Sequence, residues 1–315
     1  MVFLLAMFTA AAFLNGATDA ANSVTGAVSS GVMRPLPACA LAAAAQTAGG
    51  AVFSMAFPAV TDSVSRLAAL PENGDVRLRV CAVTLLTVAL WASAAWAAGL
   101  PTSESHGLMA ALSGCAAASG GSIDKHSWLV VALGLVLSVA GGALALPALR
   151  LFSPAGKNIC LQSRFCIGCL CASAFLHGAQ DGQKFVSLAV MCNITDSRFF
   201  AVAVCAAAMA AGTLCGGGRI VRKMGREMTD TDLYTSCCAD AGSAAALTLL
   251  TVFGVPVSTT HVRMSALTFA AAGKGKRIDR KVLLSLAAAW VTTFPACFFL
   301  AKYLWIGWDF VANCA

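Results

Sequence analysis

Charged side chains are scarce in this sequence. Only 11% of its 315 residues are Asp, Glu, Lys or Arg, and it has just 4 His and 2 Tyr. Soluble domains carry about 25% charged residues, so a chain this poor in charge cannot cover a water-facing surface. The few Lys and Arg stand in short segments between apolar runs, so the net charge of +7 does not indicate a nucleic-acid partner. The expected solvent is the lipid bilayer.

The apolar runs contain mainly small and aliphatic residues. In all, 59% of the residues are hydrophobic and 28 are Gly, and no run alternates polar with apolar side chains. Small residues let membrane helices pack closely, whereas a lipid-facing barrel would need the missing alternation. Most of the 14 Cys lie within these runs, where a thiol behaves as a small buried hydrophobe. The expected fold is therefore an all-α polytopic membrane protein, without a structural metal or a cofactor.

Ten apolar segments divide the chain. They fall near residues 2–33, 37–60, 79–98, 106–120, 128–149, 165–193, 199–215, 236–253, 261–272 and 282–306. The first and sixth have about thirty residues, more than the ~20 that cross a bilayer, and each contains a Gly and an Asp, so we expect two broken helices. The third and fourth, and the eighth and ninth, are joined by uncharged Gly-x-Pro sequences. These joints predict helical hairpins with irregular backbone at membrane depth.

The Lys and Arg residues are unevenly distributed over the loops. Thirteen lie at Arg34 and in the stretches 150–164, 219–232 and 273–281, whereas six lie on the opposite side. Positive loops stay in the cytoplasm, so we expect the first set there, in a multi-pass protein of the cytoplasmic (inner) cell membrane. Two repeats of about five helical passes each follow, over residues 1–150 and 164–315, with a cytoplasmic linker at 151–163. The count takes each hairpin as two limbs, and these limbs either span the membrane or re-enter it. Since five is odd, the second repeat is inverted.

Two motifs occur once in each half. Phe13-Leu-Asn-Gly-Ala-Thr-Asp19 aligns with Phe175-Leu-His-Gly-Ala-Gln-Asp181 at an offset of 162 residues. Gly99-Leu-Pro-Thr-Ser-Glu-Ser-His106 aligns with Gly254-Val-Pro-Val-Ser-Thr-Thr-His261 at an offset of 155. Inverted repeats with interrupted helices are the architecture of secondary transporters, whose site lies at the repeat interface. We therefore expect the two Pro-Ser/Thr hairpins to meet near the midplane.

The hairpin motifs are the candidate substrate site. A helix that starts after Pro101 or Pro256 has unpaired N–H groups in its first turn, and two such ends facing each other would attract an anion. Hydroxyl donors near these ends are Ser103, Ser105, Ser258, Thr259 and Thr260. The alternative is that these hydroxyls only cap the helices. The His residue of each motif is expected to hydrogen-bond to the backbone.

Acidic residues inside apolar segments are the candidates for ion coupling. An acid at the centre of a membrane helix costs about 2.5–3.5 kcal/mol, and Asp19 and Asp181 occupy equivalent positions in the repeat. We expect both to bind a coupling cation or a proton next to the substrate. The alternative for Asp181 is an ion pair with Lys184, three residues later. Further candidates for the coupling role are Asn22, Glu104, Gln180 and Lys184.

Arg263 follows the second hairpin motif by two residues. Its guanidinium could contact the anion directly, or extend toward the cytoplasm while its methylene groups stay in the membrane. Both alternatives are open from the residues alone.

At these positions the sequence resembles the inorganic phosphate transporter (PiT) family, also called the sodium/phosphate symporter type. Members carry twice a Gly-Ala-Asn-Asp-x-Ala-Asn-Ser-like element and twice a Gly-Leu-Pro-Val-Ser-Thr-Thr-His element. The corresponding stretches here are Asn15-Gly16-x-x-Asp19-x-Ala21-Asn22-Ser23 and Gly254-x-Pro256-Val257-Ser258-Thr259-Thr260-His261, with Gly218-Arg219-x-Val221 and Asp240 as further matches. The resemblance implies an inverted-repeat helical homodimer that moves inorganic phosphate with Na⁺ or H⁺. The ligands it implies are Asp19, Asn22, Asp181, Ser103, Ser258, Thr259 and Thr260.

The sequence departs from the family pattern at two places, and in both it looks like a bacterial variant branch. Lys184 stands where the second Asp motif often has Asn, which replaces a neutral cation ligand by a charge. Glu104 stands where a hydroxyl is usual. An extra acid suits a proton relay, and Lys184 could take the place of one cation.

The function expected from these features is import of inorganic phosphate by a secondary active transporter coupled to Na⁺ or H⁺. A carrier for sulfate or another oxyanion on the same scaffold is the first alternative. Glu104 favours phosphate, because a carboxylate can accept a hydrogen bond from H₂PO₄⁻ that sulfate cannot offer. An anion channel is a further alternative, although a channel needs no coupling acids. An enzyme is not expected, because the sequence contains no recognisable pair of a nucleophile and a base.

Overall fold

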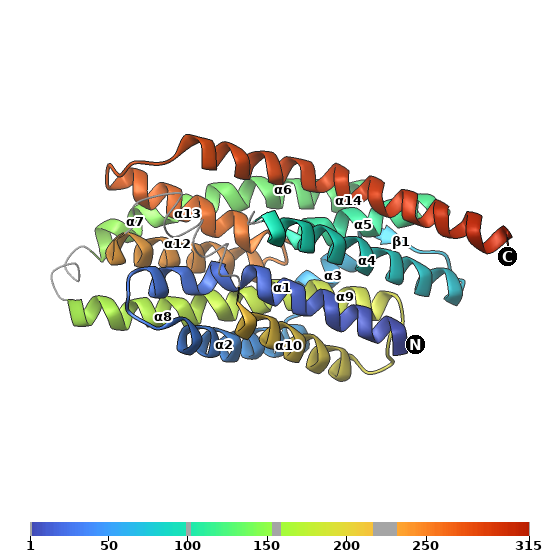
Figure 1. The fold of residues 1–315 in the computed structure, drawn as a ribbon, viewed down its shortest axis with the longest axis horizontal. Helices are drawn as coiled ribbons and strands as arrows, with labels where there is room; N and C mark the ends of the chain where they lie inside the picture. The colour runs from blue at the N-terminus through green and yellow to red at the C-terminus, as the bar shows by residue number, and fades with distance from the viewer. Residues whose placement is uncertain (1, 99–101, 153–158, 217–231, 315) are drawn as a thin grey trace.

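The structure is a computed structural model that describes residues 2–98, 102–152, 159–216 and 232–314. Nearly all of these residues are helical (Figure 1). The elements of the first half are α1 (Val2–Ser29), α2 (Pro35–Ala56), α3 (Ala59–Ser65), β1 (Ala68–Ala69), α4 (Gly74–Ala98), α5 (Glu104–Ala118), β2 (Ser122–Ile123), α6 (Lys125–Gly141), the 3-10 turn η1 (Gly142–Leu144) and α7 (Ala145–Leu151). Those of the second half are α8 (Ile159–His177), the π-helical turn η3 (Gly178–Gly182), α9 (Gln183–Met191), α10 (Arg198–Cys215), α12 (Leu233–Val252), α13 (Thr259–Gly273) and α14 (Arg280–Cys314).

Eight helical stretches of the described chain are long and apolar enough to cross a membrane. They are 2–29, 35–56, 74–98, 125–151, 160–191, 198–215, 233–252 and 283–311. The second limbs of the two hairpins, α5 and α13, are not among them. Each has 15 residues, about 22 Å at 1.5 Å per residue, which is less than the ~30 Å hydrocarbon core.

The two hairpins return to the end of the molecule from which they start. α4 and α5 occupy one end in Figure 1, while α12 and α13 occupy the opposite end. The antiparallel pairing of β1 with β2 holds the outer ends of the first hairpin together. The inner ends meet in the middle, where the rings of His106 and His261 are 5.1 Å apart. In each half, three of the eight stretches connect the two ends of the molecule, and the fourth (α4 or α12) is the first limb of a hairpin that turns back in the middle. This arrangement favours the re-entrant alternative for both hairpins, and with three crossings in each half the second half is still inverted.

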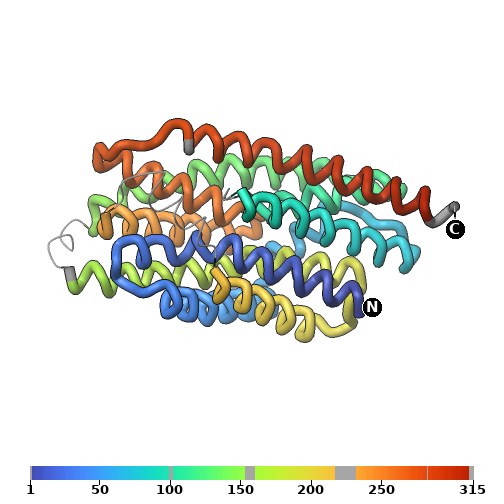
Figure 2. The backbone as a smooth tube through the Cα atoms, viewed as in Figure 1, coloured from blue at the N-terminus to red at the C-terminus, as the bar shows by residue number. Residues whose placement is uncertain are grey.

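The two ends of the bundle carry the loops that the charge distribution assigned to opposite sides. Both chain termini lie at the same end (Figure 2). At that end Arg79 pairs with Asp309 and lies 5.2 Å from the ring of Trp305. At the other end Lys276 lies 3.0 Å from Asp232. The expected joint at 99–101, residues 153–158 of the linker and the match at 218–221 fall outside the described residues.

Both helices that carry the Asp motif are continuous, which corrects the expectation that they are broken. α1 stays α-helical through Asp19, and the second copy passes from α8 into α9 through the π-helical turn. The glycines serve close packing instead. A Cβ atom at Gly16 would lie 2.0 Å from the carbonyl oxygen of Met209, and one at Gly178 would lie 1.9 Å from that of Gln46. Each glycine therefore brings its helix into backbone contact with a helix of the opposite half.

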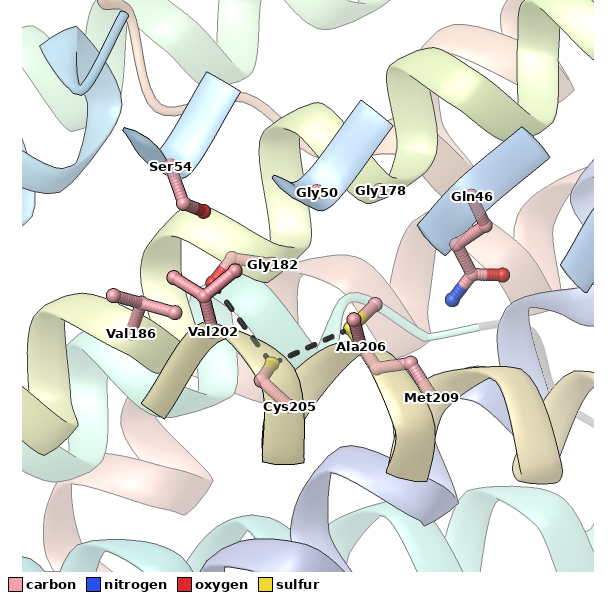
Figure 3. A pocket seen from close by; sticks show the side chains of 10 residues that line it. All are labelled: Gln46, Gly50, Ser54, Gly178, Gly182, Val186, Val202, Cys205, Ala206 and Met209. Carbon is pink, nitrogen blue, oxygen red and sulfur yellow. Dashed lines mark hydrogen bonds between the residues drawn. The ribbon is translucent and has the colours of Figure 1, made fainter. Parts of the chain in front are cut away.

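The seam between α2, η3 and α10 is packed almost without a gap. Figure 3 shows the small cavity that remains there, lined by Gly178 and Gly182 and by side chains of both flanking helices. Its volume is about 10 Å³, about the smallest that holds one water molecule. Ser54 Oγ and Gln46 Nε2 are buried here and have no hydrogen-bond partner among the described residues. Close packing of small residues joins the two halves at this seam, and elsewhere an apolar cluster that contains Phe8 and Phe185 joins them.

Candidate functional site

Asp19 lies in the middle of α1, in contact with the tip of the second hairpin. Asn22 Nδ2 donates to Asp19 Oδ1 at 2.8 Å, and Thr260 Oγ1 donates to the same oxygen at 2.9 Å. Asn22 also donates to Thr260 at 2.9 Å, and Asn15 Nδ2 donates to the other carboxylate oxygen at 3.2 Å. Since Thr260 belongs to the first turn of α13, Asp19 joins the first half of the chain to the hairpin of the second half.

Asp181 makes the mirrored set of contacts with the tip of the first hairpin. Ser105 Oγ donates to Asp181 Oδ1 at 2.8 Å, and Lys184 Nζ donates to the same oxygen at 2.8 Å. Lys184 also donates to Ser105 Oγ at 2.9 Å. The motif offsets of 162 and 155 residues place Lys184 at the position of Asn22 and Ser105 at that of Thr260. The ion pair considered for Asp181 is therefore present, and it lies inside the site.

The two acid clusters are parts of one site. Ligand atoms of Asp19, His177 and Asp181 all lie within 4.8 Å of one another, and all three residues are buried. His177 Nδ1 is 3.5 Å from Asp181 Oδ2 and 3.3 Å from Thr259 Oγ1. Carboxylate and hydroxyl oxygens are the ligands of hard cations. The arrangement can therefore hold a small cation between the two halves of the molecule.

Glu104 adds a third acid to this site. Its Oε1 accepts a hydrogen bond from Thr18, while Oε2 is buried without a partner among the described residues. Glu104 interacts electrostatically with both Asp19 and Asp181. The site thus combines three buried carboxyl groups with the single ammonium group of Lys184. An anion that enters meets an excess of acidic groups in a medium of low dielectric constant.

The five hydroxyl residues of the hairpin motifs divide into two groups. Ser103 and Ser258 are N-caps, whose Oγ atoms accept from the backbone N–H groups of His106 at 3.3 Å and His261 at 3.2 Å. The capping interpretation therefore holds for these two, although each hydroxyl proton is left to donate. Ser105, Thr259 and Thr260 instead face the acids, and Thr259 Oγ1 lies 3.4 Å from Asp181 Oδ2.

Two candidates are engaged away from the carboxylates of the site. Gln180 Nε2 donates to Thr251 Oγ1 at 2.9 Å and to Val255 O at 3.3 Å, so it holds the turn of the second hairpin. Arg263 forms a buried ion pair with Asp240 at 2.9 Å, so its guanidinium does not extend to the membrane surface.

The two motif histidines do not hydrogen-bond to backbone, contrary to expectation. All four ring nitrogens of His106 and His261 are buried and lack a partner among the described residues. Their rings pack on each other and on α14, His106 at 4.7 Å from Phe294 and His261 at 4.0 Å from Trp290. Ring packing is therefore what joins the two hairpin tips at this point.

Three site residues escaped the sequence argument, namely Asn15, Thr18 and His177. Each lies in the Asp motif and contacts an acid of the site. The repeat alignment contained a usable signal, because Asn15 and His177 are equivalent positions and both have polar side chains inside an apolar segment. Thr18 carries the same signal, because it is equivalent to Gln180, but nothing in the sequence identifies its partner Glu104, which lies 86 residues away.

Comparison with known proteins identifies relatives of this chain. The profile of the phosphate transporter family matches residues 15–155 and, a second time, residues 154–301. The chain is 31% identical to the "Probable low-affinity inorganic phosphate transporter" of Rhizobium meliloti (strain 1021), over 99% of this chain and 97% of that protein. It is 29% identical to the protein of the same name from Bacillus subtilis (strain 168), over 90% and 89% of the two chains.

The fold also matches a solved structure. A protein described as "The sodium-dependent phosphate transporter" superimposes with a TM-score of 0.86 over 98% of this chain and 99% of its own, at 17% sequence identity. That likeness establishes the shared fold. With two profile matches that together cover most of the sequence, the chain belongs to the phosphate transporter family and is a membrane transporter, not an enzyme.

Proposed function

We propose that this protein is a secondary active transporter that imports inorganic phosphate together with Na⁺ or H⁺. The observation that carries the proposal is the mismatch of charge at the site, where three buried acids, Asp19, Glu104 and Asp181, share the single ammonium of Lys184, which contacts Asp181. The first turns of α5 and α13 offer N–H donors to an anion. The acids repel that anion unless a cation or a proton neutralises them, so the two must bind together. Coupling follows from that requirement.

Phosphate is favoured over sulfate by Glu104. Its Oε2 is buried and unpartnered among the described residues, next to the tip of the first hairpin. A protonated phosphate oxygen can donate to a carboxylate, whereas sulfate carries no proton at neutral pH. The names of the two bacterial relatives point to the same substrate.

The test is uptake of labelled phosphate into proteoliposomes that contain the purified protein. Na⁺ and proton gradients are imposed separately, and sulfate is added as a competitor. We expect accumulation of phosphate above the external concentration with one of the two gradients and little inhibition by sulfate. Equilibration without accumulation would contradict coupled transport, and equal competition by sulfate would contradict the assigned substrate.

The same proposal includes a location in the cytoplasmic (inner) cell membrane and assembly as a homodimer. The excess of Lys and Arg at the end that carries Lys276 supports an orientation with that end in the cytoplasm. A cysteine introduced in place of Asn73 should react with a membrane-impermeant thiol reagent only when the reagent is added outside the cell. Cross-linking in native membranes followed by mass measurement tests the dimer.

A further inference from the structure

We propose that the ammonium group of Lys184 is a built-in cation. It occupies one of two repeat-related coupling positions, so that this protein moves one exchangeable cation fewer per phosphate than the same scaffold with a neutral residue there. The inference rests on the proposed cation-coupled transport of phosphate. It concerns the number of ions moved rather than the substrate.

The surroundings of Lys184 Nζ are those of a bound cation. The three acceptors within reach are Asp181 Oδ1 at 2.8 Å, Ser105 Oγ at 2.9 Å and the carbonyl oxygen of Val257 at 2.5 Å. An ammonium group has three N–H donors, so its hydrogen bonds are all used. Carboxylate and carbonyl oxygens are also ligands of hard cations, and carbonyls of non-helical backbone coordinate Na⁺ in transporters with broken helices.

The equivalent position in the other half holds no charge. Asn22 stands there, and its amide donates to Asp19 Oδ1 at 2.8 Å and to Thr260 Oγ1 at 2.9 Å. The two sets are otherwise alike, since each has a carboxylate on the long helix and a hydroxyl on the opposite hairpin. Asp19 is therefore the acid that still requires a diffusible cation, whereas Asp181 has a tethered one.

The position of Lys184 distinguishes it from a simple ion pair with Asp181. Ser105 belongs to the tip of the first hairpin, and Val257 directly precedes Ser258, the N-cap of α13, at the tip of the second hairpin. Lys184 thus bonds to both hairpin tips and to Asp181 while its side chain is fully buried. A pair that only neutralised Asp181 would need neither tip. A diffusible cation at this position would hold the tips together only while bound, but the lysine does so permanently.

The experiment compares Lys184→Asn with the wild type in proteoliposomes. This substitution restores the residue found at the equivalent position of the first half. The number of coupling ions per phosphate is obtained from the phosphate gradient that balances an imposed gradient of the coupling ion. We expect Lys184→Asn to move one ion more per phosphate than the wild type, and its uptake to depend sigmoidally on ion concentration. Wild-type uptake should depend hyperbolically on that concentration.

Two further variants make the comparison specific. Lys184→Met removes the charge without supplying a cation ligand and should lose most uptake. Lys302→Asn changes a lysine of α14 outside the site and should behave as wild type. An unchanged ion count in Lys184→Asn, or full uptake by Lys184→Met, would overturn the inference.

Wild-type behaviour decides the matter even where the variants fail to fold. A sigmoidal dependence of wild-type uptake on the coupling ion shows two exchangeable sites and overturns the built-in cation. Wild-type protein that moves no phosphate refutes the proposed function instead. These two failures are therefore distinguishable.

Discussion

Arg263 Nη2 lies 2.9 Å from Asp240 Oδ1, and this ion pair is buried between α1, α12 and α13. Arg263 also donates to the backbone carbonyl of Asn22 at 3.2 Å. Gly26 makes room for the acid, since a Cβ atom there would come within 2.6 Å of Asp240 Oδ2. The guanidinium is therefore neutralised by an acid outside the site, and it fastens the second hairpin to the helix that carries Asp19.

Removing one member of this pair should cost far more than removing both. Asp240→Asn leaves a buried guanidinium uncompensated, a loss of about 3–5 kcal/mol, so we expect a large drop in thermal stability in detergent. Arg263→Gln combined with Asp240→Asn should recover much of that loss. If the double variant is stable and transports, its KM for phosphate should be close to wild type. A KM for phosphate that is strongly raised in the double variant would show that Arg263 also contacts the anion.

Asp19→Asn should abolish concentrative phosphate uptake and leave folding intact. The amide keeps the shape and one acceptor for Asn22 and Thr260, but it removes the charge that attracts the coupling ion. Uptake into proteoliposomes and the elution profile of the purified protein measure the two properties. Glu72→Gln, at an exposed position, is the matched control. Normal accumulation by Asp19→Asn would exclude this residue from coupling.

The two roles of Ser258 can be separated by two substitutions. Ser258→Ala removes the N-cap of α13 and should cost about 1 kcal/mol, whereas Ser258→Gly should cost only a few tenths. Both remove the hydroxyl proton, so both should raise the KM for phosphate, roughly tenfold if the hydroxyl donates to the charged substrate. Stability in detergent and uptake kinetics give the two values. An unchanged KM in the glycine variant would leave Ser258 a cap and nothing more.

Gly16→Ala should destabilise the protein through backbone overlap alone. The new methyl group would stand 2.0 Å from the carbonyl oxygen of Met209, and overpacking of this kind costs about 1–3 kcal/mol or more. Gly168→Ala is the control, because a Cβ at that exposed helical position meets nothing within 4 Å. The control should be neutral or slightly stabilising, as expected for Ala in a helix. Thermal denaturation monitored by size-exclusion chromatography compares the two, and equal melting temperatures would contradict the close helix contact.

Asp232 should make the protein less stable at low pH. Its partial burial raises the pKa, but hydrogen bonds from Thr235 and Lys276 outweigh this and hold the pKa below its usual value of 3.8. A depressed pKa contributes stability above the usual pKa, and that contribution is lost as the pH falls through the folded-state value. At pH 7 the wild type should therefore have a higher melting temperature than Asp232→Asn. The difference in free energy of unfolding should be up to about 1 kcal/mol, as for a half-exposed ion pair. A difference that did not shrink below pH 4 would refute this assignment.

The sequence predicted some parts of the site better than others, for identifiable reasons. Asp19, Asp181 and the hairpin hydroxyls stood out because polar residues at membrane depth are costly and these recur at fixed offsets. The breaks expected in the two Asp-motif helices were wrong, because a glycine in a helix also permits close packing. The choice between spanning and re-entrant hairpins needed the structure, in which the second limbs, α5 and α13, have 15 residues each and are too short to cross.

The sequence by itself determined that the chain is an all-helical membrane protein with two inverted halves, because charge scarcity, loop charge and repeated motifs are local properties. Only the tertiary structure decided which partners those motifs meet. Thr260 reaches Asp19 across 241 residues, and Lys184 bonds to both hairpin tips. These contacts depend on how two inverted hairpins dock, and docking is set by helix packing across the whole fold rather than by any neighbouring residues in the chain.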